Sequence, residues 1–304
     1  MILEEVGDLQ SYELIDSGDG YRLERFGDYV LSRPDPAVLW KKTLSESEWN
    51  KADAEYLRSE EDRGAWKIRT NVPERWLMNY EFLNAGKKDA VSFYAKLTPF
   101  KHTGVFPEQE ANWKFICDNF SKDKDTKRTE PIKVLNLFGY TGIASVLCAK
   151  FENVKVTHVD ASKPSIGWAQ ENMIASGLPE DSIRWILEDA LKFVKREARR
   201  GTKYQAIIMD PPAFGRGAKG EVWKFNEQLP ELLKECVQLI DPNDFKFVII
   251  NAYAVSVSSL LLNNLLQDFA VEAQIKNPSY DYGELVLKQR DGKLLSTGIF
   301  GRLK

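Results

Sequence analysis

The pattern of hydrophobic and polar positions divides the chain at about residue 100. Over residues 1–100, short strand-like runs alternate with turn signals such as Ser17-Gly18-Asp19-Gly20. One helix is predicted over about 45–58, where a serine precedes mixed charges. The strands of this part are expected at 11–15, 21–26, 29–32, 65–69, 76–83 and 92–97. The pattern predicts a small β-rich accessory region.

Residues 101–304 alternate between helix and strand patterns. Five apolar runs separated by helices predict a parallel sheet covered on both faces. These runs lie at 132–137, 154–160, 183–187, 204–210 and 245–251. The helices are expected at 109–119, 143–150, 163–176, 190–199, 227–240 and 257–268. A strand-rich tail follows, with strands predicted at 271–276, 285–289 and 294–300. The expected fold class is therefore α/β, a Rossmann-like, mostly parallel sheet closed by a C-terminal antiparallel hairpin.

The composition is that of a globular protein, with 43% hydrophobic and 29% charged residues. No apolar run approaches the roughly 18 residues that span a bilayer. The N-terminus is acidic where a secretory signal would be basic. We therefore expect a cytoplasmic protein without a membrane partner. The net charge of −3 argues mildly against broad nucleic-acid affinity but allows a local basic face.

Cysteine and histidine are too few and too scattered for a disulfide framework or a metal centre. The chain has three cysteines, far apart, at 117, 148 and 236, and two histidines at 102 and 158. The cysteines are predicted to be small core residues in a reducing compartment. No metal ligand is predicted.

Two features at strand ends point to a nucleoside-type ligand. Residues 136–142 read Asn-Leu-Phe-Gly-Tyr-Thr-Gly where a strand turns into a helix, and glycines there let a ligand approach the backbone. An ordinary tight turn is the alternative. Asp160 ends the next strand, about 20 residues after Gly139, the usual place of an acid that binds ribose hydroxyls. Capping of the following helix is the alternative role.

Two further strand ends carry acids. Asp189 follows the third strand, where its carboxylate is placed to accept from an adenine amine, although helix capping is the better explanation of this residue taken alone. The most specific motif is Asp210-Pro211-Pro212-Ala213-Phe214. The prolines end the strand and leave rigid carbonyls beside one carboxylate, ready to accept hydrogen bonds from an amino group. A rigid turn with a packed phenylalanine would not explain the acid.

The cofactor loop favours S-adenosylmethionine over NAD. NAD sites use Gly-x-Gly-x-x-Gly with the pyrophosphate at a helix N-terminus. Here Leu137 stands at the first glycine position, and the bulky Phe138 and Tyr140 flank Gly139. S-adenosylmethionine has no phosphates, so it suits this loop better.

These motifs together resemble a bacterial family of class I S-adenosylmethionine-dependent methyltransferases, which includes the large-subunit ribosomal RNA cytosine-C5 and guanine methyltransferases. The loop 136–142 resembles the family's cofactor loop, and 210–214 its Asp-Pro-Pro-x-Phe motif. The segments 102–109 (His-Thr-Gly-Val-Phe-Pro-Glu-Gln) and 283–287 (Gly-Glu-Leu-Val-Leu) also resemble an uncharacterised subgroup. The resemblance covers nearly the whole chain and implies a methyltransferase domain over 101–304.

The resemblance implies a role for each matching residue. Phe106, Glu108 and Gln109 would close over the methionine end of the cofactor, Asp160 would bind the ribose and Asp189 the adenine. The implied cofactor-binding residues are Phe106, Glu108, Gln109, Phe138, Gly139, Tyr140, Thr141, Gly142, Asp160, Ala161, Asp189, Ala190 and Asp210. The predicted catalytic residues are Asp210, Pro211, Pro212 and Phe214.

The chain departs from the family in two ways. C5-methylating relatives attack cytosine with a cysteine thiolate, but 249–253 reads Ile-Ile-Asn-Ala-Tyr where that cysteine would follow. We therefore expect methylation of a nitrogen of a base in ribosomal RNA. No separate basic RNA-binding module is apparent at the N-terminus, so two alternatives stay open: a small-molecule or protein acceptor, and a non-catalytic RNA- or ribosome-associated module with a vestigial cofactor fold. The sequence does not predict an oligomeric state.

Candidate substrate contacts follow the Asp-Pro-Pro-x-Phe motif. Arg216, Lys219 and Trp223 combine positive charge with an aromatic ring, which suits phosphate and a stacked base. The expected base would be flipped out of its stack and held by Phe214 or Trp223. A solvated glycine-rich loop with Trp223 packed beneath it is the nearly equal alternative.

Overall fold

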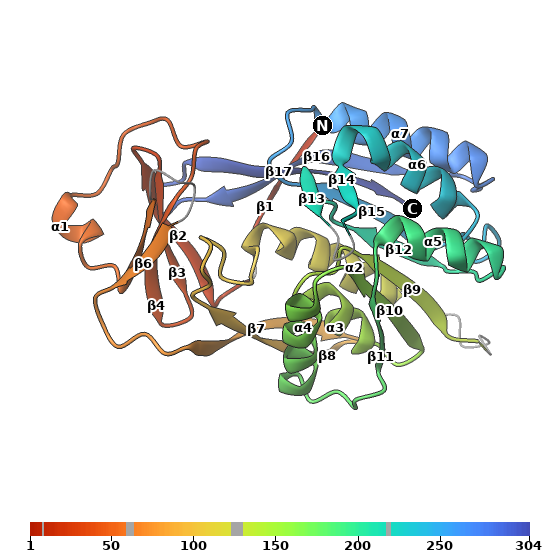
Figure 1. Cartoon of the computed structure of the whole chain (residues 1–304), viewed down its shortest axis with the longest axis horizontal. Coiled ribbons are helices and arrows are strands. Elements are labelled where there is room, and N and C mark those ends of the chain that lie inside the picture. Colours follow the sequence, from red (N-terminus) through yellow and green to blue (C-terminus); the bar gives the residue numbers. More distant parts are fainter. Residues whose placement is uncertain (8, 59–63, 123–129, 217–219) are drawn as a thin grey trace.

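The protein is described by a computed structural model that covers residues 1–7, 9–58, 64–122, 130–216 and 220–304. A helix-covered sheet forms one end of the molecule and a small β-rich region the other (Figure 1). Two long hairpins, β7–β8 and β16–β17, extend between them.

The larger part is built on an eight-stranded sheet with the order β1-β16-β17-β15-β12-β9-β10-β11. Strands β1, β9, β10, β11, β12 and β15 are parallel to their sheet neighbours, except where β15 meets β17. Strand β17 runs antiparallel to both β15 and β16. The predicted α/β fold with a C-terminal antiparallel hairpin is confirmed. The strands are β1 (Ile2–Glu5), β9 (Ile132–Leu137), β10 (Val154–Asp160), β11 (Ile183–Leu187), β12 (Ala206–Met209), β15 (Phe247–Ala252), β16 (Tyr280–Lys288) and β17 (Leu294–Leu303).

Alternate residues of the central strands face two different helix layers, as the pleat of a strand requires. In β12, Ile208 faces the cluster of α2, α3 and α4, whereas Ile207 and Met209 face that of α5, α6 and α7. Both faces are therefore buried, which is why these strands read as continuous apolar runs. The helices are α2 (Glu110–Lys122), α3 (Ile143–Ala149), α4 (Lys163–Ala175), α5 (Ala190–Arg199), α6 (Phe225–Val237) and α7 (Ser259–Glu272).

The N-terminal residues form two further sheets and also contribute β1 to the large sheet. One sheet has the order β2-β3-β4-β5-β6, and β7 pairs with β8. The division of the chain at residue 100 stays a prediction. Strand β1 belongs to the larger sheet, whereas β2–β6 form a sheet of their own. These strands are β2 (Tyr12–Gly18), β3 (Tyr21–Phe26), β4 (Tyr29–Pro34), β5 (Ala54–Arg58), β6 (Gly64–Ile68), β7 (Arg75–Asn84) and β8 (Lys87–Lys96).

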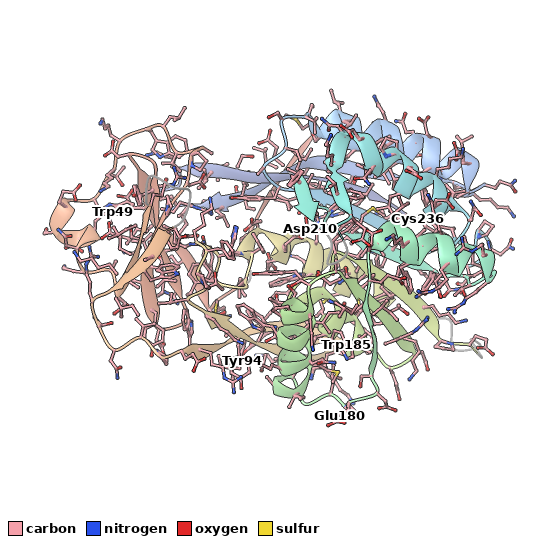
Figure 2. The ribbon with its side chains drawn as sticks, in the orientation of Figure 1. Trp49, Tyr94, Glu180, Trp185, Asp210 and Cys236 are labelled. Atoms are coloured by element: carbon pink, nitrogen blue, oxygen red, sulfur yellow. The ribbon has the colours of Figure 1, made fainter. Side chains whose placement is uncertain are left out.

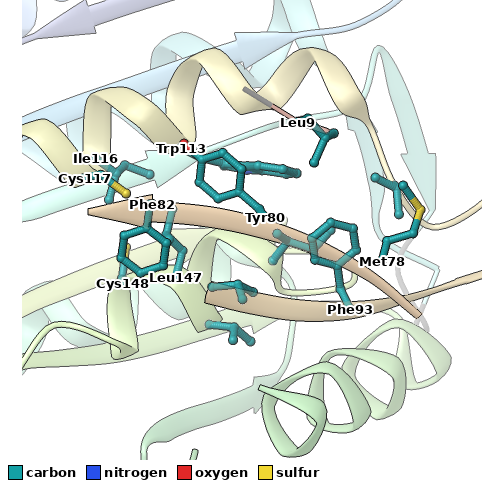
Figure 3. Close-up of a cluster of buried hydrophobic side chains, with 14 of the residues drawn as sticks. Leu9, Met78, Tyr80, Phe82, Phe93, Trp113, Ile116, Cys117, Leu147 and Cys148 are labelled. Carbon is teal, nitrogen blue, oxygen red and sulfur yellow. The ribbon is translucent and has the colours of Figure 1, made fainter. Parts of the chain in front are cut away.

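The β7–β8 hairpin is held by packing on helices, since an isolated hairpin is marginal in water. Every second residue of β7 is buried. Tyr80 and Phe93 lie against Trp113 of α2 (Figure 3). Phe82 lies against Phe151 after α3. Packing in this aromatic cluster holds the hairpin against the helices that cover the larger sheet.

Two predicted elements are wrong. The helix predicted over 45–58 ends early: α1 spans only Glu46–Trp49, and Ala54–Arg58 is strand β5. Ala54 and Tyr56 are buried while Glu55 is not, a period of two that suits pairing with β4 and β6. The strand predicted at 271–276 is also wrong. Its first residues complete the last turn of α7, which ends at Glu272 with Ala273 as its C-cap.

Sequence reasoning also missed a short hairpin, β13 (Phe214–Arg216) and β14 (Val222–Lys224), beside the predicted reaction motif. In the described part of the chain, no helix is long and apolar enough to cross a membrane.

Candidate functional site

A cavity of about 1020 Å³ opens at the carboxyl ends of β9, β10, β11, β12 and β15. Ligands of open parallel sheets bind at this edge. The cavity brings together many of the residues predicted from sequence. Its lining includes Phe106, Glu108, Gln109, Phe138, Tyr140, Asp160, Ala161, Asp189, Ala190, Asp210, Pro211, Pro212, Phe214 and Trp223.

The loop after β9 is held in an unusual conformation. Phe138 and Tyr140 have positive φ angles of 56° and 49°, which non-glycine residues seldom adopt. This places both rings in the cavity wall. Gly139, Thr141 and Gly142 do not line the cavity. Thr141 instead donates a 2.7 Å hydrogen bond to the Gly104 carbonyl, so it ties the loop to the segment before η1 (Pro107–Gln109).

Gly139 is required by packing against β10. A Cβ atom there would lie 2.3 Å from Cε1 of His158. His158 is fully buried, and burial lowers its pKa to about 3, so it is a neutral core residue. Its Nδ1 lies 3.0 Å from the Ser145 hydroxyl. The glycine therefore fixes the loop close to the sheet.

Gly139→Ala is expected to lower the free energy of unfolding by about 1–3 kcal/mol, because the added methyl overpacks the His158 site. Gly167→Ala in α4 is the matched control, since a Cβ there meets nothing within 4 Å. In mid-helix this control should stabilise the protein by about 0.5–1 kcal/mol. Urea unfolding of both variants measures the difference. Equal stabilities for the two variants would contradict the packing argument.

Asp160 both shapes the loop and faces the cavity. Its Oδ2 accepts the Tyr140 N–H at 2.8 Å and its Oδ1 accepts the Ser162 N–H at 2.8 Å. Each carboxylate oxygen keeps a second lone pair for a ligand donor. Burial raises the pKa of Asp160. The residue can therefore anchor the loop and receive two hydroxyls at once.

Asp189 caps the N-terminus of helix α5, as the helix-capping interpretation predicted. Its Oδ1 accepts the Lys192 N–H at 3.0 Å at the start of α5. The same side chain lines the cavity next to Glu188 and Ala190. Capping and ligand contact are compatible, because one carboxylate oxygen stays available.

Asp210 is a half-buried acid that lines the cavity (Figure 2). Burial, together with the nearby Glu108 carboxyl, raises the pKa of Asp210 to about 7. Burial also raises the pKa of Glu108. Among the described residues, no lysine or arginine forms an ion pair with either carboxyl. Two acids of raised pKa that no ion pair neutralises suit a ligand that brings positive charge.

A chain of side-chain hydrogen bonds orients the Gln109 amide, which contacts Asp210. Gln109 donates from Nε2 to Oδ2 of Asp210 at 3.3 Å. Its Oε1 accepts from Asn112 and Asn251, both at 3.0 Å, which fixes the amide orientation. Arg302 then donates from Nε to Oδ1 of Asn112 at 2.8 Å. The contact to Asp210 is thus set by residues from α2, β15 and β17.

Trp223 and Phe214, the two candidate stacking rings on the β13–β14 hairpin, differ in their exposure to solvent. Trp223 is only 5% exposed, donates from Nε1 to the Pro212 carbonyl at 2.7 Å and packs on Phe138. Its burial favours the interpretation in which Trp223 supports the motif from beneath. Phe214 is 55% exposed at the cavity. The side chain of Arg216 lies outside what the structure describes, and Lys219 lies outside the described residues.

Sequence reasoning missed several lining residues, among them Phe100, His102 and Tyr253. Tyr253 directly follows β15, so its position past a strand end was a usable signal. Phe100 and His102 precede η1 and have no such signal, because only the tertiary fold brings them to the cavity.

The three cysteines are free and buried. Burial raises the pKa of Cys117 to about 12 and raises the pKa of Cys148 and of Cys236 well above the usual range. None of them lines the cavity. A thiolate nucleophile for attack on a cytosine ring is therefore not available from these residues.

Treatment of the native protein with a thiol reagent such as N-ethylmaleimide is expected to leave its activity unchanged, because buried thiols of raised pKa do not react. Mass spectrometry should find the three cysteines unmodified in the native protein and modified after denaturation. Stoichiometric labelling with loss of activity would show that a cysteine takes part in the reaction.

Comparisons with known proteins agree with this geometry. A crystal structure of a SAM-dependent methyltransferase from Agrobacterium tumefaciens matches with a TM-score of 0.86 and 37% identity, covering 100% of this chain and 93% of that one. The chain belongs to the S-adenosylmethionine-dependent methyltransferases. A second solved structure, a candidate methyltransferase complexed with SAH, shares the fold with a TM-score of 0.68 and 19% identity over 98% of this chain and 76% of its own.

Curated relatives are named as ribosomal RNA methyltransferases. Ribosomal RNA large subunit methyltransferase K/L of Shewanella frigidimarina is 30% identical over 183 residues, or 58% of this chain. The match spans only 24% of that relative's length. No protein-family model matches the chain.

The cavity fits the cofactor of this methyltransferase family. The lone pairs of Asp160 suit the two ribose hydroxyls, and Asp189 lies at the neighbouring strand end, where an adenine amine would be held. The buried carboxyl of Glu108 and the half-buried carboxyl of Asp210 suit the ammonium and sulfonium charges of S-adenosylmethionine.

Proposed function

We propose that this methyltransferase transfers the methyl group of S-adenosylmethionine to a nitrogen of a base in ribosomal RNA, in the cytoplasm. One observation carries the choice of a nitrogen: the cavity is lined by the half-buried carboxyl of Asp210 and by no cysteine. A base nitrogen needs a hydrogen-bond acceptor that orients its N–H, whereas C5 of cytosine needs a nucleophile. The names of the curated relatives support RNA as the acceptor.

When bound, S-adenosylmethionine supplies an electrophilic methyl group. The residues of this chain position the acceptor in line with it and exclude water. Asp210 accepts a hydrogen bond from the acceptor amine, and the carbonyl of Pro211 or Pro212 accepts a second one. Gln109 holds the Asp210 carboxyl by its 3.3 Å hydrogen bond. Phe214 stacks on the base, supported from beneath by Trp223. Arg216 and Lys219 are assigned to the RNA backbone.

The proposed role makes the reaction depend on pH. The ionised Asp210 carboxyl is the acceptor, and its pKa is raised to about 7. The value of kcat/KM for the cofactor should therefore fall about tenfold per unit below pH 7 and level off above it. Asp210→Asn should remove this inflection. An unchanged pH profile in that variant would assign the titration to another group.

The test of the function is transfer of labelled methyl from S-adenosylmethionine to ribosomal RNA purified from cells that lack this gene. Label is expected in one RNA fragment with the wild-type protein and not with Asp210→Ala. Digestion to nucleosides then identifies the methylated atom. Label on C5 of a pyrimidine would overturn the nitrogen assignment. No label above the Asp210→Ala background, despite cofactor binding, would favour a small-molecule or protein acceptor.

A further inference from the structure

We propose that the cavity contains a second aromatic wall, formed by Phe100, His102 and Tyr253, which binds an unpaired nucleobase of a single-stranded RNA segment opposite Phe214. The inference rests on the proposed function and deepens it. It assigns the acceptor side of the cavity to residues that no cofactor contact explains.

The cavity is divided between two sets of residues. Asp160 and Asp189, at the ends of β10 and β11, serve the cofactor side. The remaining wall comes from the 98–102 turn, from the residues after β15 and from β17. This wall lies on the far side of Asp210 in the sheet order, because β12 stands between β9 and β15.

His102 and Tyr253 of this wall form a continuous aromatic surface with the neighbouring ring of Phe106, which is assigned to the cofactor. The ring centroid of Phe106 lies 5.4 Å from that of His102 and 6.0 Å from that of Tyr253. Those of His102 and Tyr253 are 6.4 Å apart. All three side chains are half-buried and line the cavity, so each presents part of its surface to a ligand. Rings at such spacing suit a flat aromatic guest.

The wall is uncharged although basic residues lie behind it. Burial, with the charges of Arg33, Lys101 and Arg22, lowers the pKa of His102 to about 4. Burial also raises the pKa of Tyr253. Both rings are therefore neutral at physiological pH. They offer stacking and neutral hydrogen bonds, which favour a base over a phosphate group.

Phe100 extends this wall to the cavity rim. Its side chain is 69% exposed, and Phe214 from the β13–β14 hairpin is 55% exposed. A single exposed phenylalanine needs no explanation. Here two of them, distant in sequence, line one cavity. Such rings stack on single-stranded bases without reading their sequence.

The turn that carries Phe100 is anchored to the N-terminal sheet. The Thr98 hydroxyl accepts the Phe100 N–H at 3.2 Å and lies 2.7 Å from the His102 carbonyl oxygen. Trp66 donates from Nε1 to the Thr98 carbonyl at 2.7 Å, and Tyr56 donates to the Pro99 carbonyl at 3.1 Å. Strands β5 and β6 thus help to hold this turn in place. This gives the N-terminal region a part in acceptor binding.

The test uses a short single-stranded oligoribonucleotide that contains 2-aminopurine, whose fluorescence changes on stacking, titrated into the protein saturated with S-adenosylhomocysteine. Phe100→Ala is expected to raise the dissociation constant roughly 5- to 150-fold, as loss of one stacking ring does. Phe100→Trp should restore binding. Leu83→Ala, at an exposed apolar residue outside the cavity, is the control and should bind like wild type. Calorimetry should give all four proteins the same affinity for S-adenosylhomocysteine.

The outcomes separate this inference from the proposed function. If wild type methylates RNA but Phe100→Ala binds the oligonucleotide and methylates RNA unchanged, the aromatic wall is overturned and the function stands. If wild type methylates no RNA but binds the oligonucleotide, and Phe100→Ala weakens that binding, the aromatic wall is supported and the proposed function is overturned. If wild type does not bind the oligonucleotide, the wall is overturned.

Discussion

Replacing Asp210 by alanine is expected to lower kcat for methyl transfer by about 10²–10³-fold, the usual cost of removing one preorganised hydrogen-bond partner from a reaction centre. The carboxyl is half-buried just after β12, and Gln109 donates a 3.3 Å hydrogen bond to it. Alanine leaves the acceptor amine without an oriented partner. Single-turnover assays with saturating cofactor measure this loss.

Two variants serve as controls for Asp210→Ala. Asp210→Asn keeps the side-chain volume and one acceptor oxygen, so it should retain more activity than alanine. Glu180→Ala removes an exposed acid in the loop after α4, far from Asp210 in Figure 2, and should behave like wild type. Full activity of Asp210→Ala with unchanged cofactor affinity would remove Asp210 from the mechanism.

Asp160→Ala is expected to raise the dissociation constant of S-adenosylmethionine at least about 100-fold, since hydrogen bonds to a charged group contribute about 1.5–3 kcal/mol each. The variant loses the carboxylate that we propose holds the two ribose hydroxyls. It also releases the Tyr140 and Ser162 N–H groups, which Asp160 holds at 2.8 Å each. Isothermal titration calorimetry measures the affinity directly.

Asp160→Asn separates these two effects. Its amide nitrogen would face one of the two N–H donors, so one loop contact is lost while one acceptor oxygen remains. We expect an affinity between those of wild type and alanine. Wild-type affinity in a folded Asp160→Ala protein would mean that the ribose is held elsewhere.

The sequence predicts the central sheet well because burial on both faces leaves a simple pattern. The predicted bounds of β9, β10 and β11 match the structure. In contrast, β1 is short and mostly exposed, and it pairs with residues 283–286 of β16, so no local pattern marks it. The helix predicted over 45–58 failed because charged residues obscured the two-residue period at Ala54 and Tyr56.

Some residues of the candidate site could likewise be predicted from the sequence, and others could not. Asp160, Asp189 and Asp210 lie at strand ends, where topology alone brings them to one edge. The chain of hydrogen bonds behind Asp210 has no sequence signal, because Arg302 and Asn112 are 190 residues apart. The 98–102 turn is likewise placed by distant contacts from β5 and β6.

The central claim is that this cavity holds S-adenosylmethionine with its methyl group directed at Asp210. A crystal structure of the protein with S-adenosylhomocysteine tests it most directly. We predict the ribose hydroxyls on Asp160, the adenine beside Asp189 and the sulfur facing Asp210. A ligand bound outside the cavity, or one whose ribose lies away from Asp160 with its sulfur turned from Asp210, would contradict the account.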